Sequence, residues 1–463
     1  MQSLKSSRIA IIVLSMLFFS NCKDEPVTPT TVTDDFESGS IGEMVKTDET
    51  AWELCIANDN DDTSLPESWR SWWYVKMEQV ATYTPTQITV KNSGWPYYYV
   101  PVYSYDQQAW HHFSEDEVTQ TNEKEIQIQK QFEQQTVWIA RFYPYTFSDL
   151  ETYLNSIRGN VSVDIQIPGY SQEGKPLYLL KITDPSVPVA GKKRIFMHAR
   201  THPAETPPSF VIEGIVNYLL SGTAEASDLL SRFEFYIFPM QNVDGVIAGN
   251  YRSTPKSENL EVMWFRDSTN SPGLTSEAPV EVTTIQQVAS QLMNDGGPAV
   301  TIALNLHASN SEPDICPFFY PHFGPESKGY SPLEASLWDE QLAFIGNVEN
   351  HYGSDHIEPV PNEGGSSFAS KMYPESWWWN NYSDQVMAMT FEMTYGRAGH
   401  APRWVEPDDY RNLGVSLALG IRDYSDGNMP QASFMLKSLR DHRIANLKYP
   451  ELYPPDAEDE MKK

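Results

Sequence analysis

Residues 194–221 read RIFMHARTHPAETPPSFVIEGIVNYLLS and join a short apolar run to a longer segment with helical spacing. The run Arg194 to Ala199 predicts a buried strand, and Ser209 to Ser221 predicts a helix. A turn rich in proline and polar residues connects the two. Because a strand that leads directly into a helix is the repeating unit of α/β sheets, this stretch indicates the fold class of the region around it.

The same pattern of apolar runs and helical segments continues along the chain on both sides of this stretch. Further apolar runs predict buried strands, and one more segment has helical spacing: Leu177 to Thr183, Phe233 to Pro239, Val300 to Leu306 and Val386 to Met393 for the strands, and Val280 to Asp295 for the helix. We therefore expect an α/β domain over residues 151–430, with its functional site at the ends of the strands.

The residues before this domain have a different pattern. Between residues 36 and 150, short alternating or apolar runs are separated by turn residues, at Trp72 to Met77, Gln87 to Asn92, Tyr97 to Val102, Glu125 to Gln129 and Val137 to Phe142. Runs of period two at this spacing, with almost no helical stripe, are typical of an antiparallel β-sandwich.

The first 22 residues resemble a bacterial lipoprotein signal peptide. Lys5 and Arg8 precede the apolar run Ile9 to Phe19, which is too short to span a bilayer stably. Residues 19–22, FSNC, resemble a lipobox, in which Cys22 would be lipidated and become the first residue of the mature protein. An ordinary cleaved signal peptide with an incidental cysteine is the alternative.

Residues 23–35 are rich in Pro, Thr and acidic residues and predict an unstructured tether. We therefore expect a protein outside the bacterial cytoplasm, in the periplasm or on the cell surface, that contacts the membrane through a lipid anchor only. Residues 431–463 are expected to form a C-terminal extension and a solvated tail. The oligomeric state is not predicted by any of these features.

Composition excludes several classes of function. The 463 residues include 33 Lys and Arg against 62 Asp and Glu, a formal net charge of −29, which argues against nucleic acid as a partner. A hydrophobic fraction of 40% and an aromatic fraction of 13% exclude a disordered acidic chain. Three cysteines without a C-x-x-C motif exclude a cysteine-rich zinc module. Cys55 and Cys316 either pair across the domains or stay unpaired.

Three polar residues lie where the predicted strands end. His202 and Glu205 form an H-x-x-E turn directly after a strand, and His307 ends the strand from Val300. Two imidazoles and a carboxylate are ligands that zinc accepts, with a fourth position left open for catalysis. A capping role for Glu205 is the alternative. Glu392 ends another apolar strand, and a lone buried carboxylate is costly, so a functional role is favoured for it.

Over residues 36–424 the chain is similar to the zinc metallocarboxypeptidases of the cytosolic-carboxypeptidase-like branch, whose members pair an N-terminal β-sandwich with an α/β peptidase domain. The resemblance rests on seven short motifs in order: FYPYTFSDL at 142–150, GYSQEGK at 169–175, ARTHPAET at 199–206, PMQNVDG at 239–245, GNYR at 249–252, LH at 306–307 and TFE at 390–392. It implies a zinc-dependent hydrolase acting on a peptide or peptide-like substrate.

The resemblance also implies roles for individual residues. One zinc ion per chain would be held by His202, Glu205 and His307. Arg252 would polarise the scissile carbonyl, and Glu392 would act as general base and then as general acid.

Three further residues would contact the substrate. Family members place a tyrosine hydroxyl over the substrate from a mobile loop, for which Tyr373 is our choice and Tyr382 the competitor. Arg200, within the ligand turn, and Glu261 are also assigned to substrate binding.

The chain departs from the family where the substrate carboxylate would bind. In the family, an Asp supports a zinc histidine and an Asn-Arg pair grips the terminal carboxylate; the matching positions here are Asn259, Glu261 and Val262. Asn259 is still able to accept a hydrogen bond from a ligand histidine. Glu261, roughly 4 Å from a substrate carboxylate, would repel it by about 1 to 4 kcal/mol.

Several explanations of this departure stay open. Another cation takes over the carboxylate, with Arg266, Arg397 and Arg403 as candidates; or the substrate presents a neutral or cationic group there; or activity is lost. Our leading hypothesis is a zinc peptidase or amidase with non-standard recognition of the substrate C-terminus. The alternative is a weak or inactive peptidase-fold lipoprotein that binds peptide or glycan without turnover.

Overall fold

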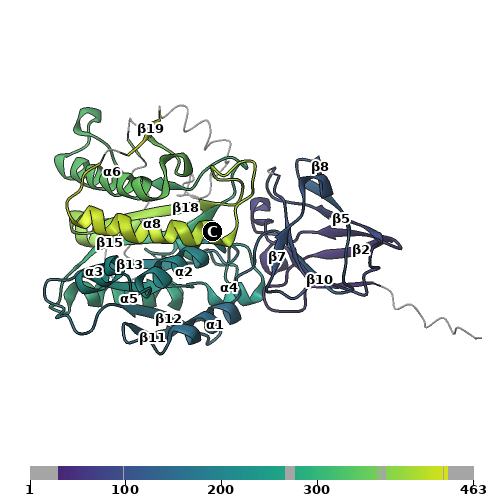
Figure 1. Ribbon diagram of the computed structural model, residues 1–463, viewed down its shortest axis with the longest axis horizontal. Helices are drawn as coiled ribbons and strands as arrows, with labels where there is room; N and C mark the ends of the chain where they lie inside the picture. The colour runs from purple at the N-terminus through teal and green to yellow at the C-terminus, as the bar shows by residue number, and fades with distance from the viewer. Residues whose placement is uncertain are drawn as a thin grey trace, which may run out of the picture.

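The computed structural model describes residues 30–96, 98–265, 277–361, 364–365, 372–430 and 432–435. The predicted signal peptide, Cys22 and nearly all of the C-terminal extension lie outside these residues, so the lipid anchor and the location outside the cytoplasm stay predictions. Figure 1 shows two parts, a β-sheet domain and a larger α/β domain, side by side.

The N-terminal domain is a sandwich of two five-stranded sheets. One sheet contains, in spatial order, β1 (Thr31–Thr33), β4 (Tyr74–Glu78), β10 (Val137–Ala140), β6 (Val102–Ser104) and β7 (Trp110–His112). The other contains β2 (Glu43–Asp48), β3 (Ala51–Cys55), β5 (Pro85–Lys91), β9 (Glu125–Gln131) and β8 (Val118–Asn122). Inward-facing apolar residues of both sheets form one core, as the alternating pattern predicts.

Three details of this domain differ from the sequence prediction. β1 lies within the expected tether of residues 23–35, where it pairs with β4. β3 and β5 are parallel, although the predicted sheets are antiparallel throughout. The run from Tyr97 to Val102 contains a strand only at its last residue, where β6 begins.

Cys55 and Cys316 are both free thiols.

The second domain is built on a seven-stranded mixed sheet. Its strands are, in spatial order, β11 (Val163–Tyr170), β12 (Pro176–Ile182), β14 (Phe233–Phe238), β13 (Lys193–Ala199), β15 (Val300–Ser309), β18 (Met387–Thr394) and β16 (Phe318–Tyr320). The four central strands, β14, β13, β15 and β18, are mutually parallel. All five predicted strands of this domain are present. Their parallel arrangement brings the ends of β13, β15 and β18 to one edge of the sheet.

Helices cover both faces of this sheet. One face packs against α2 (Pro207–Leu219), α3 (Ala224–Arg232), α6 (Pro332–Tyr352) and α8 (Pro407–Ser425). The other packs against α5 (Val280–Asn294) and α7 (Pro374–Tyr382). α1 (Phe147–Ile157) crosses the predicted domain boundary at residue 150, and α4 (Val243–Ala248) follows β14. A short pair, β17 (Val360–Pro361) and β19 (Phe434–Met435), completes the described elements.

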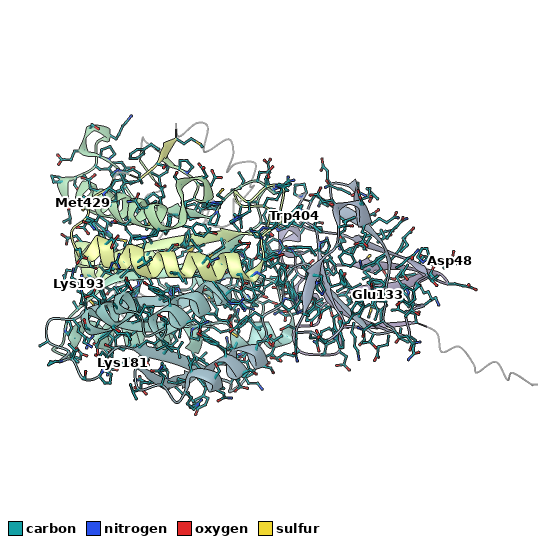
Figure 2. All side chains as sticks on the ribbon, viewed as in Figure 1. Asp48, Glu133, Lys181, Lys193, Trp404 and Met429 are labelled. Carbon is teal, nitrogen blue, oxygen red and sulfur yellow. The ribbon has the colours of Figure 1, made fainter. Side chains whose placement is uncertain are left out.

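The two domains share buried side chains at their boundary. Trp404, labelled in Figure 2 where the domains meet, precedes α8 and packs into the sandwich core. Its indole Nε1 donates a hydrogen bond to Glu115 Oε1 of the sandwich at 3.0 Å. Within the described residues, no helix has both the length and the hydropathy needed to cross a bilayer.

Candidate metal centre

The turn after β13 is fixed by the side chain of Arg200. This residue adopts a left-handed φ of 58°, which non-glycine residues rarely do outside constrained sites. Its buried guanidinium donates hydrogen bonds to the carbonyl oxygens of Pro203 and Tyr145 and to Ser209 Oγ. The expected role of Arg200 in substrate binding is therefore corrected to a structural one, because its donors are already used in holding the turn.

A close approach of three segments places this turn beside the loop that bears Arg252. A Cβ atom on Gly245 would lie 2.5 Å from Pro203 Cγ and 2.5 Å from the Ser253 carbonyl oxygen. Glycine is therefore required at this position, since any side chain would push the ligand turn away from the arginine loop. The amide of Ala204 also donates to the carbonyl oxygen of Tyr251 at 3.1 Å.

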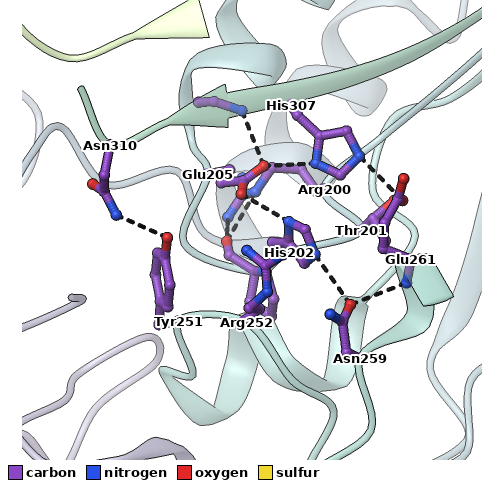
Figure 3. Close-up of polar contacts among 12 residues, drawn as sticks. Arg200, Thr201, His202, Glu205, Tyr251, Arg252, Asn259, Glu261, His307 and Asn310 are labelled. Carbon is purple, nitrogen blue, oxygen red and sulfur yellow. Dashed lines mark hydrogen bonds and ion pairs between the residues drawn. The ribbon is translucent and has the colours of Figure 1, made fainter. Parts of the chain in front are cut away.

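The structure brings His202, Glu205 and His307 together, all three buried, with one ligand atom from each within 4.8 Å of the others. His202 Nδ1 lies 2.7 Å from Glu205 Oε1, and His307 Nδ1 lies 2.9 Å from Glu205 Oε2 (Figure 3). The Ala308 amide donates to Glu205 Oε2 at 2.9 Å and fixes the carboxylate. Two imidazole nitrogens and a carboxylate facing one point form a donor set that suits zinc.

The outward ring nitrogens of both histidines also have partners. His202 Nε2 lies 3.1 Å from Asn259 Oδ1, the expected contact to this residue. His307 Nε2 lies 3.2 Å from Glu261 Oε2. Partners of this kind orient a metal-bound imidazole and fix which nitrogen faces the metal. The pair of outer contacts therefore presents Nδ1 of each histidine to the centre.

Glu261 is placed differently from the sequence expectation. It lies in a short 3₁₀ turn, Leu260–Val262, in which the Glu261 amide donates to Asn259 Oδ1 at 3.1 Å. Its carboxylate is buried, and Asn305 Nδ2 donates to Oε1 at 2.9 Å while Oε2 faces His307. The expectation that Glu261 meets a substrate carboxylate is therefore corrected: its contacts are those of a support for His307.

Electrostatic interactions within the cluster follow from these contacts. Although burial lowers the pKa of His307, the carboxylates of Glu261 and Glu205 raise that pKa well above its usual range. Although burial raises the pKa of Glu205, the two histidines lower it below its usual range. The three groups therefore act as one charge-coupled cluster, as expected of a site built around a cation.

Glu392 lies next to the cluster on the neighbouring strand. In the parallel pair of β15 and β18, Glu392 is in direct register with His307, so both side chains leave the same face of the sheet. It is 1% exposed, and within the described part of the chain neither carboxylate oxygen has a hydrogen-bond partner. Burial raises its pKa well above the usual range; His307 opposes this effect, and Glu205 reinforces it.

Arg252 is also buried and lies near His202. Its guanidinium carbon lies 5.7 Å from the ring centre of Trp69, a residue of the sandwich domain. Its positive charge contributes to lowering the pKa of His202, after burial as the main cause. Arg252 is thus a cation at the edge of the cluster.

The two tyrosine candidates occupy different places. Tyr382 lies on α7, where its hydroxyl donates to Ser290 Oγ of α5 at 3.4 Å and its ring packs against Trp377, so it belongs to the core. Tyr373 directly precedes α7. The carbonyl oxygen of its neighbour Met372 accepts from the Trp264 amide at 3.1 Å, beside the Glu261 turn. The role of Tyr373 stays a prediction.

The arginines considered for carboxylate binding have other partners. Arg397 donates to Asp314 Oδ1 at 2.8 Å, and Arg403 donates to both oxygens of Asp409 at 2.8 Å. Arg266 lies outside the described residues. Arg397 and Arg403 are therefore engaged in ion pairs and are poor candidates for binding a substrate carboxylate.

A further buried carboxylate, which sequence reasoning missed, lies close enough to Glu261 for their charges to interact. Glu375, in the first turn of α7, accepts from Thr390 Oγ1 at 2.6 Å. Burial, together with the like charge of Glu261, raises the pKa of Glu375 to about 7. No sequence signal marks it, because an acidic residue in a first helical turn is ordinary.

We expect the stability of the protein to fall as pH rises between about 4.5 and 7, the ordinary and raised pKa values of Glu375. The folded state holds this proton more tightly than the unfolded state, so stability is full below 4.5 and is lost as Glu375 ionises, by about 3 kcal/mol. Urea unfolding at pH 5 and pH 8 measures the change. Glu375→Gln should remove this part of the pH dependence, and an unchanged slope in the variant would contradict the assignment.

Two family models match the chain. The cytosolic carboxypeptidase N-terminal domain matches residues 32–142, and the zinc carboxypeptidase model matches residues 150–287. The first match covers the sandwich, and the second covers His202, Glu205 and Arg252.

Curated relatives match over shorter stretches. Cytosolic carboxypeptidase 2 of Homo sapiens is 39% identical over 140 residues, 29% of this chain and 16% of that protein. Cytosolic carboxypeptidase 3 of Bos taurus is 26% identical over 261 residues, 49% of this chain and 25% of that protein. The chain thus spans a quarter or less of the length of these two relatives.

Solved structures are similar over both domains. A metallo-carboxypeptidase from Burkholderia cenocepacia has a TM-score of 0.72 and 21% identity, covering 86% of this chain and 100% of that one. A metallo-carboxypeptidase from Pseudomonas aeruginosa has a TM-score of 0.69 and 21% identity, covering 86% and 99%. At this identity the likeness shows the fold.

Proposed function

We propose that this chain, which matches the zinc carboxypeptidase model over residues 150–287, hydrolyses peptide bonds at a zinc centre formed by His202, Glu205 and His307. The observation that carries this proposal is the convergence of three buried ligands beside Glu392, which is in register with His307 on the next strand. An oriented metal site with an adjacent buried carboxylate is the arrangement that amide hydrolysis by activated water requires.

The described side chains suit this chemistry. Zinc, when bound, would lower the pKa of a water molecule toward about 7 and polarise the scissile carbonyl. Glu392 takes the proton of the attacking water and passes it to the leaving amine, a role favoured by its raised pKa and its lack of competing hydrogen bonds among the described residues. Arg252 offsets the negative charge that develops on the carbonyl oxygen.

Recognition of the substrate C-terminus is proposed to be non-standard. Val262 offers no charge, and Glu261 supports His307. Arg397 and Arg403 are engaged with Asp314 and Asp409. The described residues at these positions therefore provide no cation for a terminal carboxylate.

We expect zinc-loaded protein to cleave a matched pair of peptides, one with a free and one with an amidated C-terminus, with kcat/KM values within about threefold of each other. If a cation of the site paired with the free C-terminal carboxylate, amidation would remove that ion pair and weaken peptide binding tenfold or more. We expect no such ion pair here. The same comparison is made for each sequence of a peptide library that includes peptides with D-residues. Strict dependence on a free carboxylate would contradict non-standard recognition and leave zinc hydrolysis intact.

A second candidate function is binding of peptide or glycan without turnover. The same departure at Glu261 and Val262 favours it, because a site without a cation for the substrate carboxylate keeps the fold and the metal ligands but lacks a group that places the substrate for hydrolysis. Zinc-loaded protein that binds a library peptide yet hydrolyses none would favour this candidate over the first. A peptide or peptide-like partner is common to both.

A further inference from the structure

The sandwich domain contacts the loop that bears Arg252 through one buried carboxylate. Asp59 lies in the short 3₁₀ turn Asp59–Asp61 of the sandwich. Its Oδ1 accepts from the Tyr251 amide at 2.6 Å, and its Oδ2 accepts from the Arg252 amide at 2.8 Å. Oδ2 also accepts from the amide and the hydroxyl of Ser253, at 2.8 and 2.9 Å. All four donors belong to three consecutive residues.

The next residue of the turn adds contacts to the same loop. Asn60 Oδ1 accepts from Asn250 Nδ2 at 2.9 Å, and Asn60 Nδ2 donates to the Thr254 carbonyl oxygen at 3.0 Å. To make these contacts Asn60 adopts a left-handed φ of 57°. Asparagine tolerates this conformation better than most residues, and the surrounding contacts maintain it. The turn thus follows the loop on both sides of Arg252.

The guanidinium itself also rests on the sandwich. Trp69 lies under it at 5.7 Å from the ring centre to the guanidinium carbon. The backbone of Arg252 and the end of its side chain are therefore both held by residues of the other domain. The metal ligands and Arg252 both belong to the α/β domain, so the sandwich supports the cation of the cluster from outside that domain.

A buried carboxylate is an unusual way to close a loop. Asp59 is 6% exposed; burial raises the pKa of its carboxyl group, and the four hydrogen bonds from the Arg252 loop oppose that effect. A charged acceptor forms stronger and more directional bonds than a neutral one, at the cost of desolvation. The carboxylate therefore fixes the position of the loop backbone, and its burial costs free energy of folding.

We propose that Asp59 is a positioning residue of the active site: by binding the amides of Tyr251, Arg252 and Ser253, the sandwich domain holds the Arg252 guanidinium where negative charge develops on the substrate. This inference rests on the proposed hydrolytic function and assigns the sandwich a direct part in it. A displacement of about 1 Å in a group that stabilises the transition state lowers the rate by about 10²-fold.

The test is a double-mutant cycle on the full chain with peptide hydrolysis as one readout. Asp59→Asn keeps the size of the side chain but removes its charge and one acceptor. We expect kcat to fall about 10²-fold with KM and zinc content unchanged. In an Arg252→Ala background, the same change should cost less than about twofold, because the group that Asp59 positions is already gone. Equal losses in both backgrounds would overturn the proposal.

Hydrogen exchange gives a readout that does not depend on activity. The amides of Tyr251, Arg252 and Ser253 should exchange faster in Asp59→Asn than in the parent protein, and unchanged protection there would overturn the proposal. Should the wild-type chain hydrolyse nothing, the proposed function fails while the exchange data still report on the loop. Ser253→Ala, which removes one of the four donors, provides a milder variant if Asp59→Asn does not fold.

A matched control lies two residues further along. Asp61 is exposed and has a φ of 57°, which asparagine accepts. Asp61→Asn therefore removes the same charge from the same turn without touching the Arg252 loop, and should leave kcat and amide exchange unchanged. A loss equal to that of Asp59→Asn would indicate that net charge of the turn, rather than the hydrogen bonds, is responsible, and would contradict the proposal.

Discussion

Replacement of Glu392 by glutamine is expected to lower kcat by 10²- to 10⁴-fold, the range that a positioned general base and acid contributes. Glutamine has the same shape and keeps one acceptor, but it takes no proton from water at neutral pH. Because Glu392 is not among the three clustered ligand candidates, zinc content should stay at one ion per chain. Steady-state kinetics and metal analysis on the same sample measure both quantities.

A control for this change is available on α6. Glu349 is buried like Glu392 and accepts a hydrogen bond from the Ser433 amide at 2.9 Å, far along the chain from the metal cluster. Glu349→Gln should leave kcat within a few-fold of the parent value. If Glu392→Gln retains hydrolysis, or loses zinc and activity together, then Glu392 is not the proton-transfer group.

Replacement of His307 by alanine should abolish both stoichiometric zinc and hydrolysis. The change removes one of three ligands and also leaves Glu261 without its histidine partner inside the fold. Asn259→Ala is the graded comparison, because it removes the outer contact of His202 and the cap on the Glu261 amide but none of the three ligands, and such outer partners typically contribute 10- to 100-fold in metal affinity. Competition with a chromophoric chelator measures both affinities.

We expect zinc affinity to decrease in the order parent protein, Asn259→Ala, His307→Ala. Zinc added in excess should restore hydrolysis to Asn259→Ala, whose three ligands remain, and should not restore it to His307→Ala. A His307→Ala variant that binds zinc as tightly as the parent would exclude His307 as a ligand.

Much of the second domain was predictable because its strands are buried on both sides. Runs such as Arg194 to Ala199 are short and mostly apolar, which is typical of buried strands, and in parallel strands their ends meet at one edge of the sheet. This is why His202 and His307, about 100 positions apart in the chain, were expected at one point. Glu392 follows the same logic on β18.

The partners of these residues were not predictable in the same way. The sequence predicts substrate-binding roles for Arg200 and Glu261, yet Arg200 holds its own turn and Glu261 supports His307. A sequence position gives a side chain's type and neighbours along the chain. Which of several nearby acceptors it contacts depends on tertiary packing, which local pattern does not encode.

The contribution of the sandwich had no sequence signal at all. Asp59 lies in the stretch NDNDD, residues 58–62, whose composition is typical of a solvated turn. Its burial follows from docking against Tyr251 to Ser253, almost 200 positions away. For the same reason β1 was assigned to a tether, since three residues gain strand structure only by pairing with β4.

The most direct test of the zinc centre is anomalous diffraction at the zinc absorption edge on crystals of the zinc-loaded protein. We predict one peak per chain, at about 2.0 to 2.2 Å from His202 Nδ1, His307 Nδ1 and a Glu205 carboxylate oxygen, the usual zinc distances for nitrogen and oxygen ligands. The absence of a peak between these three residues, or a single peak elsewhere in the chain, would contradict the proposed centre and the hydrolytic mechanism built on it.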